Sequence, residues 1–210
     1  MKIRDFKIGK QLLLSYTLLL LFVFLLGAET YWQSHQLHNQ IVTMYNHPLQ
    51  VRRALDNLKN ETQTMSLNMR NLILSENEQE KATAVGAIEW SEASAELQFT
   101  TLRERYLGPK EDVEDAYRSY MLWKTALKNN VELALDGNVE QAWKNLQDGN
   151  TVESNKERFL AEIRIIDEFA IKKGDTLYAQ SETLFDQLNQ ITTILLMSMT
   201  LLAFLLFQLV

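Results

Sequence analysis

The stretch from Leu37 to Leu72, LHNQIVTMYNHPLQVRRALDNLKNETQTMSLNMRNL, decides the fold. Along it the positions of one face recur at alternating steps of four and three residues, the heptad spacing of a helix that packs against another helix. These positions are Leu37, Ile41, Met44, Pro48, Val51, Leu55, Leu58, Thr62, Met65, Met69 and Leu72. We expect Pro48 to kink or locally unwind the helix, because the proline ring removes an amide donor. The pattern therefore predicts one long helix from about Tyr31 to Ser75.

Three similar apolar seams follow towards the C-terminus, over residues 85–106, 113–134 and 163–191. The first ends at Gly108-Pro109, the second stops at Asp136-Gly137-Asn138, and a short helix is expected over 139–146. The last helix is expected to begin near Thr151. With seven glycines and two prolines in 210 residues, the chain is poor in the turn formers of sandwiches and barrels. We predict an all-α fold, an up-down-up-down antiparallel four-helix bundle whose first and last helices continue into transmembrane helices.

The two ends of the chain are apolar and free of charge. Residues 12–28 read LLLSYTLLLLFVFLLGA, and residues 191–210 read ITTILLMSMTLLAFLLFQLV. At about 1.5 Å per residue, twenty such residues cover the roughly 30 Å of a bilayer core, and seventeen lie at the short limit. A cleaved signal peptide is the alternative for the first stretch. We favour a retained anchor, because cleavage after Ala28 would place Leu26 where a small residue is needed.

Charge orients the two predicted spans. Residues 1–11 carry four basic residues and Asp5, so the positive-inside rule keeps this N-terminus in the cytoplasm and places residues 29–190 in the periplasm. All other charged residues lie within 29–190, which leaves that segment 26 of the 27 acidic and 17 of the 21 basic residues, a net charge of -9. Such a charge disfavours nucleic-acid binding. No basic residue follows the second span, so we expect the chain to be the front part of a longer protein.

Four stretches carry a resemblance to a known family. They are MKIRDFKIGKQL at the start, MYNHPLQV (Met44 to Val51), MSLNMRNLIL (Met65 to Leu74) and LALDGNVEQAWKNL (Leu133 to Leu146). In this order and spacing the chain resembles the four-helix-bundle sensor module of methyl-accepting chemotaxis proteins, which also occurs on membrane histidine kinases and diguanylate cyclases. Members continue after the second span with a HAMP linker and a signalling domain, which these 210 residues do not include.

The resemblance implies the input module of a bacterial inner-membrane receptor. It would act as a homodimer with the first helices paired, would sense a periplasmic small molecule or a binding protein, and would transmit a helix displacement to a chemotaxis, kinase or cyclase output. A structural or scaffolding membrane protein, whose helical domain binds a protein partner without signalling, is the alternative. Neither hypothesis involves a cofactor. No catalytic motif or paired nucleophile is found, so we expect no enzymatic activity within these residues.

Arg70, flanked by Asn68 and Asn71, is the first candidate for ligand binding. A guanidinium beside two amides can hold a carboxylate with two hydrogen bonds. The resemblance implies the same, because family members that sense amino acids or organic acids use arginines of this helix at the subunit interface. Arg158 and Arg164 are the candidates for the opposite wall. The alternative interpretation is that Arg70 is a solvated surface residue, and that Arg158 and Arg164 pair with acidic neighbours.

Other polar and aromatic residues have structural interpretations. His35 and His38 lie one helical turn apart and are only weak candidates for a metal, because no carboxylate or cysteine accompanies them at ligand spacing. His47 is expected to satisfy a carbonyl freed by the proline. Glu92 and Asn130 fall on apolar seams and are expected to face each other and fix the helix register, or else to line a polar cavity. We expect Trp90, Trp123 and Trp143 to be packing residues. Tyr31 and Trp32 fit the aromatic belt at the outer interface of the membrane. Arg52 and Arg53 are expected to form a solvated cationic spot.

Overall fold

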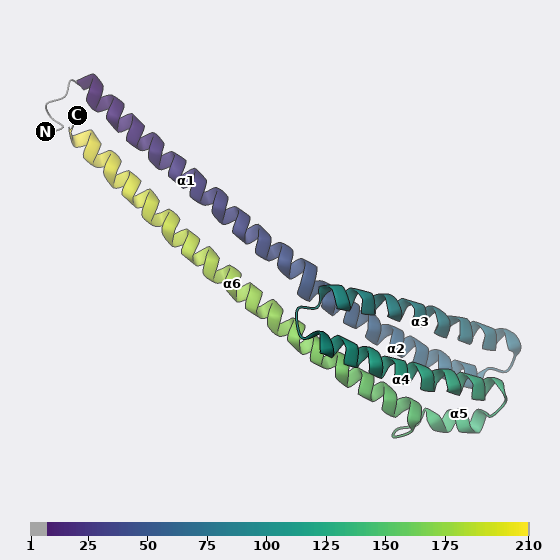
Figure 1. Ribbon diagram of the computed structural model, residues 1–210. Coiled ribbons are helices and arrows are strands. Elements are labelled where there is room, and N and C mark those ends of the chain that lie inside the picture. The colour runs from purple at the N-terminus through teal and green to yellow at the C-terminus, as the bar shows by residue number, and fades with distance from the viewer. Residues whose placement is uncertain (1–7, 210) are drawn as a thin grey trace. The chain divides into compact units, whose positions relative to one another are not determined.

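The computed structural model describes residues 8–209, and these residues form helices and short turns without any strand. In chain order the elements are α1 (Ile8–Met44), a π-helical turn η2 (Tyr45–Leu49), α2 (Gln50–Leu74), α3 (Glu78–Arg105), α4 (Lys110–Leu135), α5 (Val139–Asn145) and α6 (Thr151–Leu209), as Figure 1 shows. The predicted all-α fold is confirmed.

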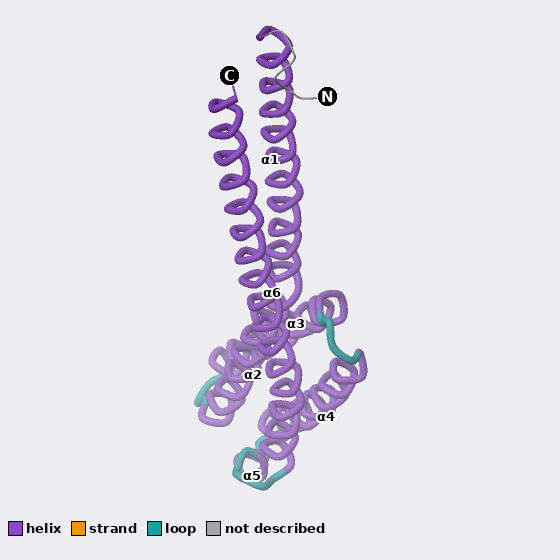
Figure 2. The backbone as a smooth tube through the Cα atoms, turned by 90° about the vertical axis from the view of Figure 1, so that its left-hand side faces the viewer, coloured by secondary structure: helices purple, strands orange, loops and turns teal. Residues whose placement is uncertain are grey.

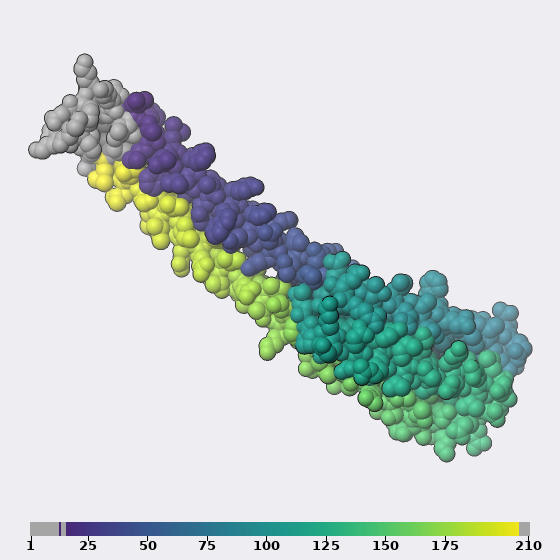
Figure 3. Space-filling view, in the orientation of Figure 1, coloured from purple at the N-terminus to yellow at the C-terminus, as the bar shows by residue number. Residues whose placement is uncertain are grey.

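The described chain divides into two compact units, which we treat separately. Residues 44–175 form the bundle, and residues 8–43 with 176–209 form the paired-helix unit. In the bundle, α2, α3, α4 and the first part of α6 run side by side in alternating directions, joined at their ends by short loops (Figures 1 and 2). Figure 3 shows the face of the bundle on which α3 and α4 lie. The predicted up-down-up-down bundle is therefore confirmed.

The heptad seam of the quoted stretch forms one wall of the bundle core. From Val51 to Leu72 its apolar side chains are all buried. Thr62 is buried within this seam, and its hydroxyl donates a 2.6 Å hydrogen bond to the carbonyl of Leu58. This bond satisfies the polar group where water is excluded, so the threonine is accommodated in the apolar series.

Aromatic side chains fill the middle of the core. Phe159 of α6 stacks on Trp123 of α4 with ring centroids 6.2 Å apart, and it also meets Phe99 of α3 and Tyr120 of α4. All four side chains are fully buried. Three helices thus meet at one aromatic cluster, which packs α6 against α3 and α4.

The prediction for Pro48 is confirmed, since the helix unwinds locally into the π-helical turn Tyr45–Leu49.

The prediction for His47 was wrong. Its Nδ1 lies 3.0 Å from the carbonyl oxygen of Arg105, at the end of α3, and not against a carbonyl freed by the proline. Because a carbonyl only accepts, the ring donates from Nδ1. The bond joins two helices, so local spacing along one helix could not predict it.

Glu92 and Asn130 do not face each other, so the preferred interpretation of these two residues was wrong. Asn130 is buried, donates to the carbonyl of Ala142 over 3.0 Å and accepts from the amide of Asn145 over 2.9 Å. Glu92 instead forms a 2.7 Å ion pair with Lys124 of α4. The reason is that α5 folds back onto α4 and supplies the partners of Asn130.

Only one of the three tryptophans expected to pack is in the core. Trp123 is fully buried, whereas Trp90 is 77% and Trp143 44% exposed. Trp90 lies on the outer side of α3 and Trp143 on the short helix α5. The expectation was wrong for these two because a large apolar side chain on a helical surface is compatible with the same spacing as a buried one.

We expect the variant Tyr120→Phe to keep or raise the stability of the bundle by about 1 kcal/mol, because the buried Tyr120 hydroxyl has no hydrogen-bond partner among the described residues. Burial also raises the pKa of this hydroxyl. The matched variant Tyr106→Phe should lose about 1 kcal/mol or more, because the Tyr106 hydroxyl donates a 2.6 Å bond to Asp112. Chemical denaturation of both variants is the measurement. Equal losses in the two would show that the Tyr120 hydroxyl is hydrogen-bonded after all.

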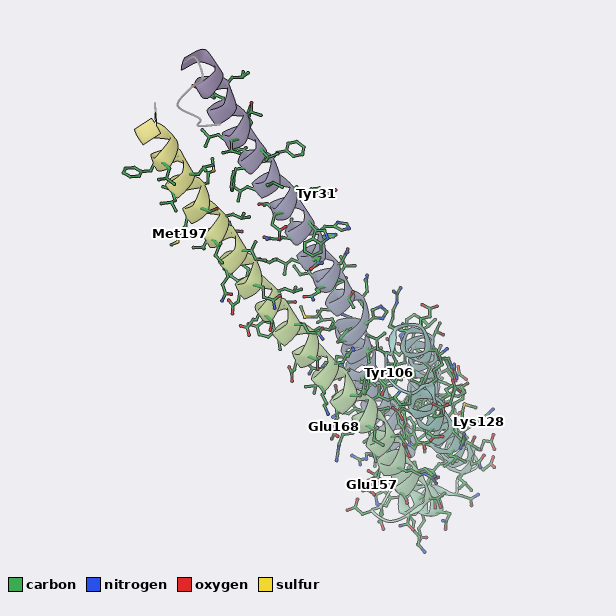
Figure 4. The ribbon with its side chains drawn as sticks, turned by 60° about the vertical axis from the view of Figure 1, so that its left-hand side comes forward. Tyr31, Tyr106, Lys128, Glu157, Glu168 and Met197 are labelled. Carbon is green, nitrogen blue, oxygen red and sulfur yellow. The ribbon has the colours of Figure 1, made fainter. Side chains whose placement is uncertain are left out.

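The paired-helix unit contains α1 up to Thr43 and α6 from Thr176, which run side by side in opposite directions (Figures 1 and 2). The chain has two helices long and apolar enough to cross a membrane, in α1 and in α6. Large apolar side chains point outward, as for Tyr31 and Met197 in Figure 4, which are 77% and 68% exposed. A hydrogen bond of 2.6 Å from Ser181 to Gln40 joins the two helices. The basic residues Lys2, Arg4 and Lys7 of the predicted cytoplasmic N-terminus lie outside the described residues.

Candidate ligand-binding groove

A groove of about 680 Å³ lies between α2 and α6 in the bundle. Its walls come from Thr62 of the α2 seam, from a row of α2 beside that seam, and from a row of α6 at steps of four and three residues. The lining residues are Lys59, Thr62, Gln63, Ser66, Leu67 and Arg70 from α2, and Lys156, Leu160, Arg164 and Asp167 from α6. The volume lies in the range of roughly 300 to 1,000 Å³ that is usual for small-molecule sites.

The groove is cationic, because its lining contains four basic side chains and one carboxylate. Lys59 donates to Asp167 over 2.9 Å, and Arg52, about two turns earlier on α2, donates to the same carboxylate over 3.4 Å. Lys156 pairs with Glu153, three residues earlier on α6. These contacts account for two of the four cations.

The other two cations are Arg70 and Arg164. Neither forms an ion pair or a side-chain hydrogen bond with any residue between 8 and 209. Both side chains belong to exposed residues at the mouth of the groove, one on each helix. Two guanidiniums without internal partners thus line one groove from opposite walls, and each has its planar set of donors available for an anion.

The structure brings together only part of the predicted site. Arg70 and Arg164 line the same groove, but Arg158 is exposed and does not line it. Asn68 and Asn71 line a separate hollow of about 390 Å³ between the end of α2 and the start of α3. Helix geometry explains the separation, because Asn68 lies two residues before Arg70 and therefore about 200° around the helix.

Besides Thr62, which was placed on the buried seam, sequence reasoning missed five polar groups of the groove: Lys59, Gln63, Ser66, Lys156 and Asp167. A signal for three of them was present. Lys59, Gln63, Ser66 and Arg70 follow one another at steps of four, three and four residues, which places them on one face of α2. The two residues of α6 could not be found in this way, because their register against α2 depends on the packing of the whole bundle.

Two groups of charged side chains elsewhere in the bundle form internal ion pairs. Arg103 donates to Glu114 over 2.8 Å, and this hydrogen bond lowers the pKa of the glutamate. Lys124 holds both Glu92 and Glu96. These pairs join α3 to α4. They are structural contacts between these two helices.

The weak metal candidates His35 and His38 are exposed on α1, in the paired-helix unit. Among residues 8–209 no three histidine, aspartate or glutamate side chains gather as a metal-binding group would require. The two histidines remain a single pair at a spacing of three residues.

Two features of the described chain are decisive for its classification: an antiparallel four-helix bundle, and first and last helices that extend into segments apolar enough to cross a membrane. Residues 5–185 match the family described as a four helix bundle sensory module for signal transduction. The chain belongs to this family. Comparison with curated proteins and with solved structures found no match.

The matched family is a sensory module and not a catalytic one. The family match spans the whole bundle, so the α2/α6 groove lies inside the matched region. A sensory module needs a place where a stimulus acts and a path by which its effect leaves. The groove is the candidate for the place where the stimulus acts. The candidate for the path is α6, which extends from the groove to Leu209 as one helix.

Proposed function

We propose that this sensory module is the input part of a bacterial transmembrane receptor, and that it binds a small carboxylate, an organic acid or an amino acid, in the groove between α2 and α6. The observation that carries the proposal is the pair of unpartnered arginines, Arg70 and Arg164, on opposite walls of one groove. A carboxylate between them would receive charge-assisted hydrogen bonds from both helices.

The rest of the lining supports a ligand with polar groups besides its carboxylates. Gln63 and Ser66 contribute an amide and a hydroxyl to the same groove, and Leu67 and Leu160 contribute apolar surface. This mixture of a few polar groups with apolar side chains is usual for sites that bind small molecules. An amino acid would place its carboxylate at the arginines and its other groups along Gln63 and Ser66.

The mechanism that we propose is a shift of α6 against α2. A ligand held by both helices stabilises the arrangement in which its contacts are best, and it can bias the equilibrium only by its difference in affinity for the two arrangements. A coupling of about 1 to 3 kcal/mol changes an output several-fold to a hundredfold. Because α6 is helical from Thr151 to Leu209, a displacement of its first part is carried along the helix axis.

We propose the inner membrane as the location, with residues 12–28 and 191–210 as the two spans, residues 1–11 in the cytoplasm and residues 29–190 in the periplasm. Support comes from the two helices of sufficient length and apolarity, and from the four basic residues that precede the first span. A chemotaxis protein, a histidine kinase or a diguanylate cyclase is the class of receptor to which such a module would belong.

We further propose that two copies pair through α2. One exposed face of this helix carries Leu67 and Leu74, which are seven residues apart and 57% and 68% exposed. Such residues lie on one helical stripe, as at the seam of a coiled coil. Leu67 also lines the groove, so a second copy packed on this stripe would close its open side.

Disulfide cross-linking tests signalling, because the chain has no cysteine of its own. Gln40→Cys with Ser181→Cys would place one thiol on each helix of the paired-helix unit, at positions that touch in the structure. Succinate, aspartate, glutamate and citrate would be added to the full chain in nanodiscs. We expect at least one of them to change the cross-linking rate, and the added substitution Arg70→Gln to abolish the change. A rate that never changes although a ligand binds would favour a scaffold that does not signal.

A further inference from the structure

The only carboxylate in the lining of the groove is Asp167, and its position is unusual for a site that takes anions. A negative charge repels an anionic ligand, so its presence needs a compensating role. The side chain of Asp167 is 18% exposed and contacts two cations of α2, Lys59 at 2.9 Å and Arg52 at 3.4 Å. Asp167 is thus a fixed internal anion, held from the opposite helix.

The contacts of Asp167 determine how many cations a ligand meets. Its closest partner, Lys59, also lies 3.7 Å from Asp56, but that carboxylate is 65% exposed and beyond hydrogen-bond distance. Lys156 pairs with Glu153 outside the lining. With Lys59 neutralised by Asp167 and Lys156 by Glu153, the free cations of the groove are Arg70 and Arg164.

We propose that the groove selects a dianion, such as a short dicarboxylate, and that Asp167 sets this charge by occupying Lys59. The inference rests on the proposed ligand site and extends it to the ligand charge. A monoanion leaves one arginine without a partner, whereas a trianion brings its third carboxylate to a lysine that Asp167 already holds. Asp167 therefore acts as a specificity-determining residue, without needing to touch the ligand.

The neighbouring Glu168 provides a matched control. It carries the same charge one residue further along α6, about 100° around the helix, and it is exposed and does not line the groove. Figure 4 labels Glu168 on α6. If the effect of Asp167 came only from the total charge of the chain, Glu168→Gln would reproduce it.

The experiment uses the full chain in nanodiscs of zwitterionic lipid, with butyrate, succinate and tricarballylate as mono-, di- and tricarboxylate probes. Affinities are measured by calorimetry at neutral pH. We expect the wild type and Glu168→Gln to prefer succinate. In Asp167→Asn the freed Lys59 should raise the affinity for tricarballylate about tenfold, as expected for the loss of one nearby repulsive charge and the gain of one free cation. The preferred probe then changes from the dicarboxylate to the tricarboxylate.

A second variant keeps the test valid if Asp167→Asn alone folds poorly. The double variant Lys59→Gln with Asp167→Asn removes both members of the pair and restores the wild-type count of free cations in the groove lining, to which Arg52 does not belong. It should prefer succinate again. A change to tricarballylate in the double variant as well would overturn the proposal, because Lys59 would then not be the group through which Asp167 sets the ligand charge.

The remaining outcomes separate this inference from the proposed function. If succinate binds the wild type and Arg70→Gln abolishes binding, but Asp167→Asn leaves the order of the three probes unchanged, the ligand site stands and the inference about Asp167 is wrong. If none of the three carboxylates binds either the wild type or Asp167→Asn, both the carboxylate site and the inference are rejected.

Discussion

Phe159→Ala is expected to lower the free energy of unfolding of the bundle by about 3 to 5 kcal/mol, the usual cost of removing a buried aromatic ring. Phe159 is fully buried, and its ring meets the rings of Phe99, Tyr120 and Trp123 on two other helices. The cavity left by alanine would remove contacts from three helices at once. Hydrogen exchange of the bundle amides in the full chain measures the loss.

Ile165→Ala is the matched control for this core variant. Ile165 lies six residues further along the same helix and is 51% exposed. Its truncation should change stability by less than about 0.5 kcal/mol, as is common for surface substitutions. Comparable losses in Phe159→Ala and Ile165→Ala would contradict the position of the aromatic cluster in the core.

Arg70→Gln and Arg164→Gln are each expected to weaken the binding of a carboxylate by about ten- to a hundredfold. The reason is the loss of a charge-assisted hydrogen bond, which contributes about 1.5 to 3 kcal/mol. Because the two arginines come from different helices, both variants should also lose the ligand-dependent change in cross-linking. Calorimetry with succinate and the Gln40→Cys, Ser181→Cys pair measure the two effects.

Two arginines of the same helices provide controls for this loss. Arg53 of α2 and Arg158 of α6 are exposed and do not line the groove. Arg53→Gln and Arg158→Gln should change the affinity no more than a small, salt-dependent amount, since exposed charges are strongly screened. A loss in either control as large as in Arg70→Gln would mean that the ligand binds elsewhere.

The cations of the groove fall into two kinds: Arg70 and Arg164 are available to a ligand, whereas Lys59 is already paired with Asp167. Arg70 and Arg164 are available because no acidic residue of the bundle reaches them, whereas Lys59 lies against Asp167. Although the net charge of the chain is -6, two cations without acidic partners thus line this groove from two helices. Such a pair indicates an anionic ligand more directly than the presence of one arginine alone.

The helices and their boundaries were predictable from local pattern. The turn at Asp136-Gly137-Asn138 separates α4 from α5, and Gly137 has the positive φ of 85° that favours glycine. Likewise, the predicted disturbance at Pro48 is a π-helical turn. These features depend on backbone hydrogen bonding within a few residues, so neighbouring residues suffice to predict them.

The partners of polar side chains were not predictable in the same way. Asn130 lies on an apolar seam, yet its partners are in α5, twelve and fifteen residues away. His47 reaches the carbonyl of Arg105, 58 residues away in sequence. Sequence periodicity predicts which side of a helix is apolar. It does not predict which residue of another helix lies opposite a given side chain.

By itself, the sequence determined the helical class, the four-helix count of the bundle, the two apolar segments and the choice of Arg70 and Arg164 as candidate ligand residues. These follow from period, turn residues and charge, all of which act over short distances along the chain. The tertiary structure alone decided that Arg70 and Arg164 share one groove, that Asn68, Asn71 and Arg158 stand apart from it, and that Asp167 holds Lys59. The physical reason is that side chains meet across helices only after close packing has set the rotation and axial register of each helix, a result of the whole core rather than of any one segment.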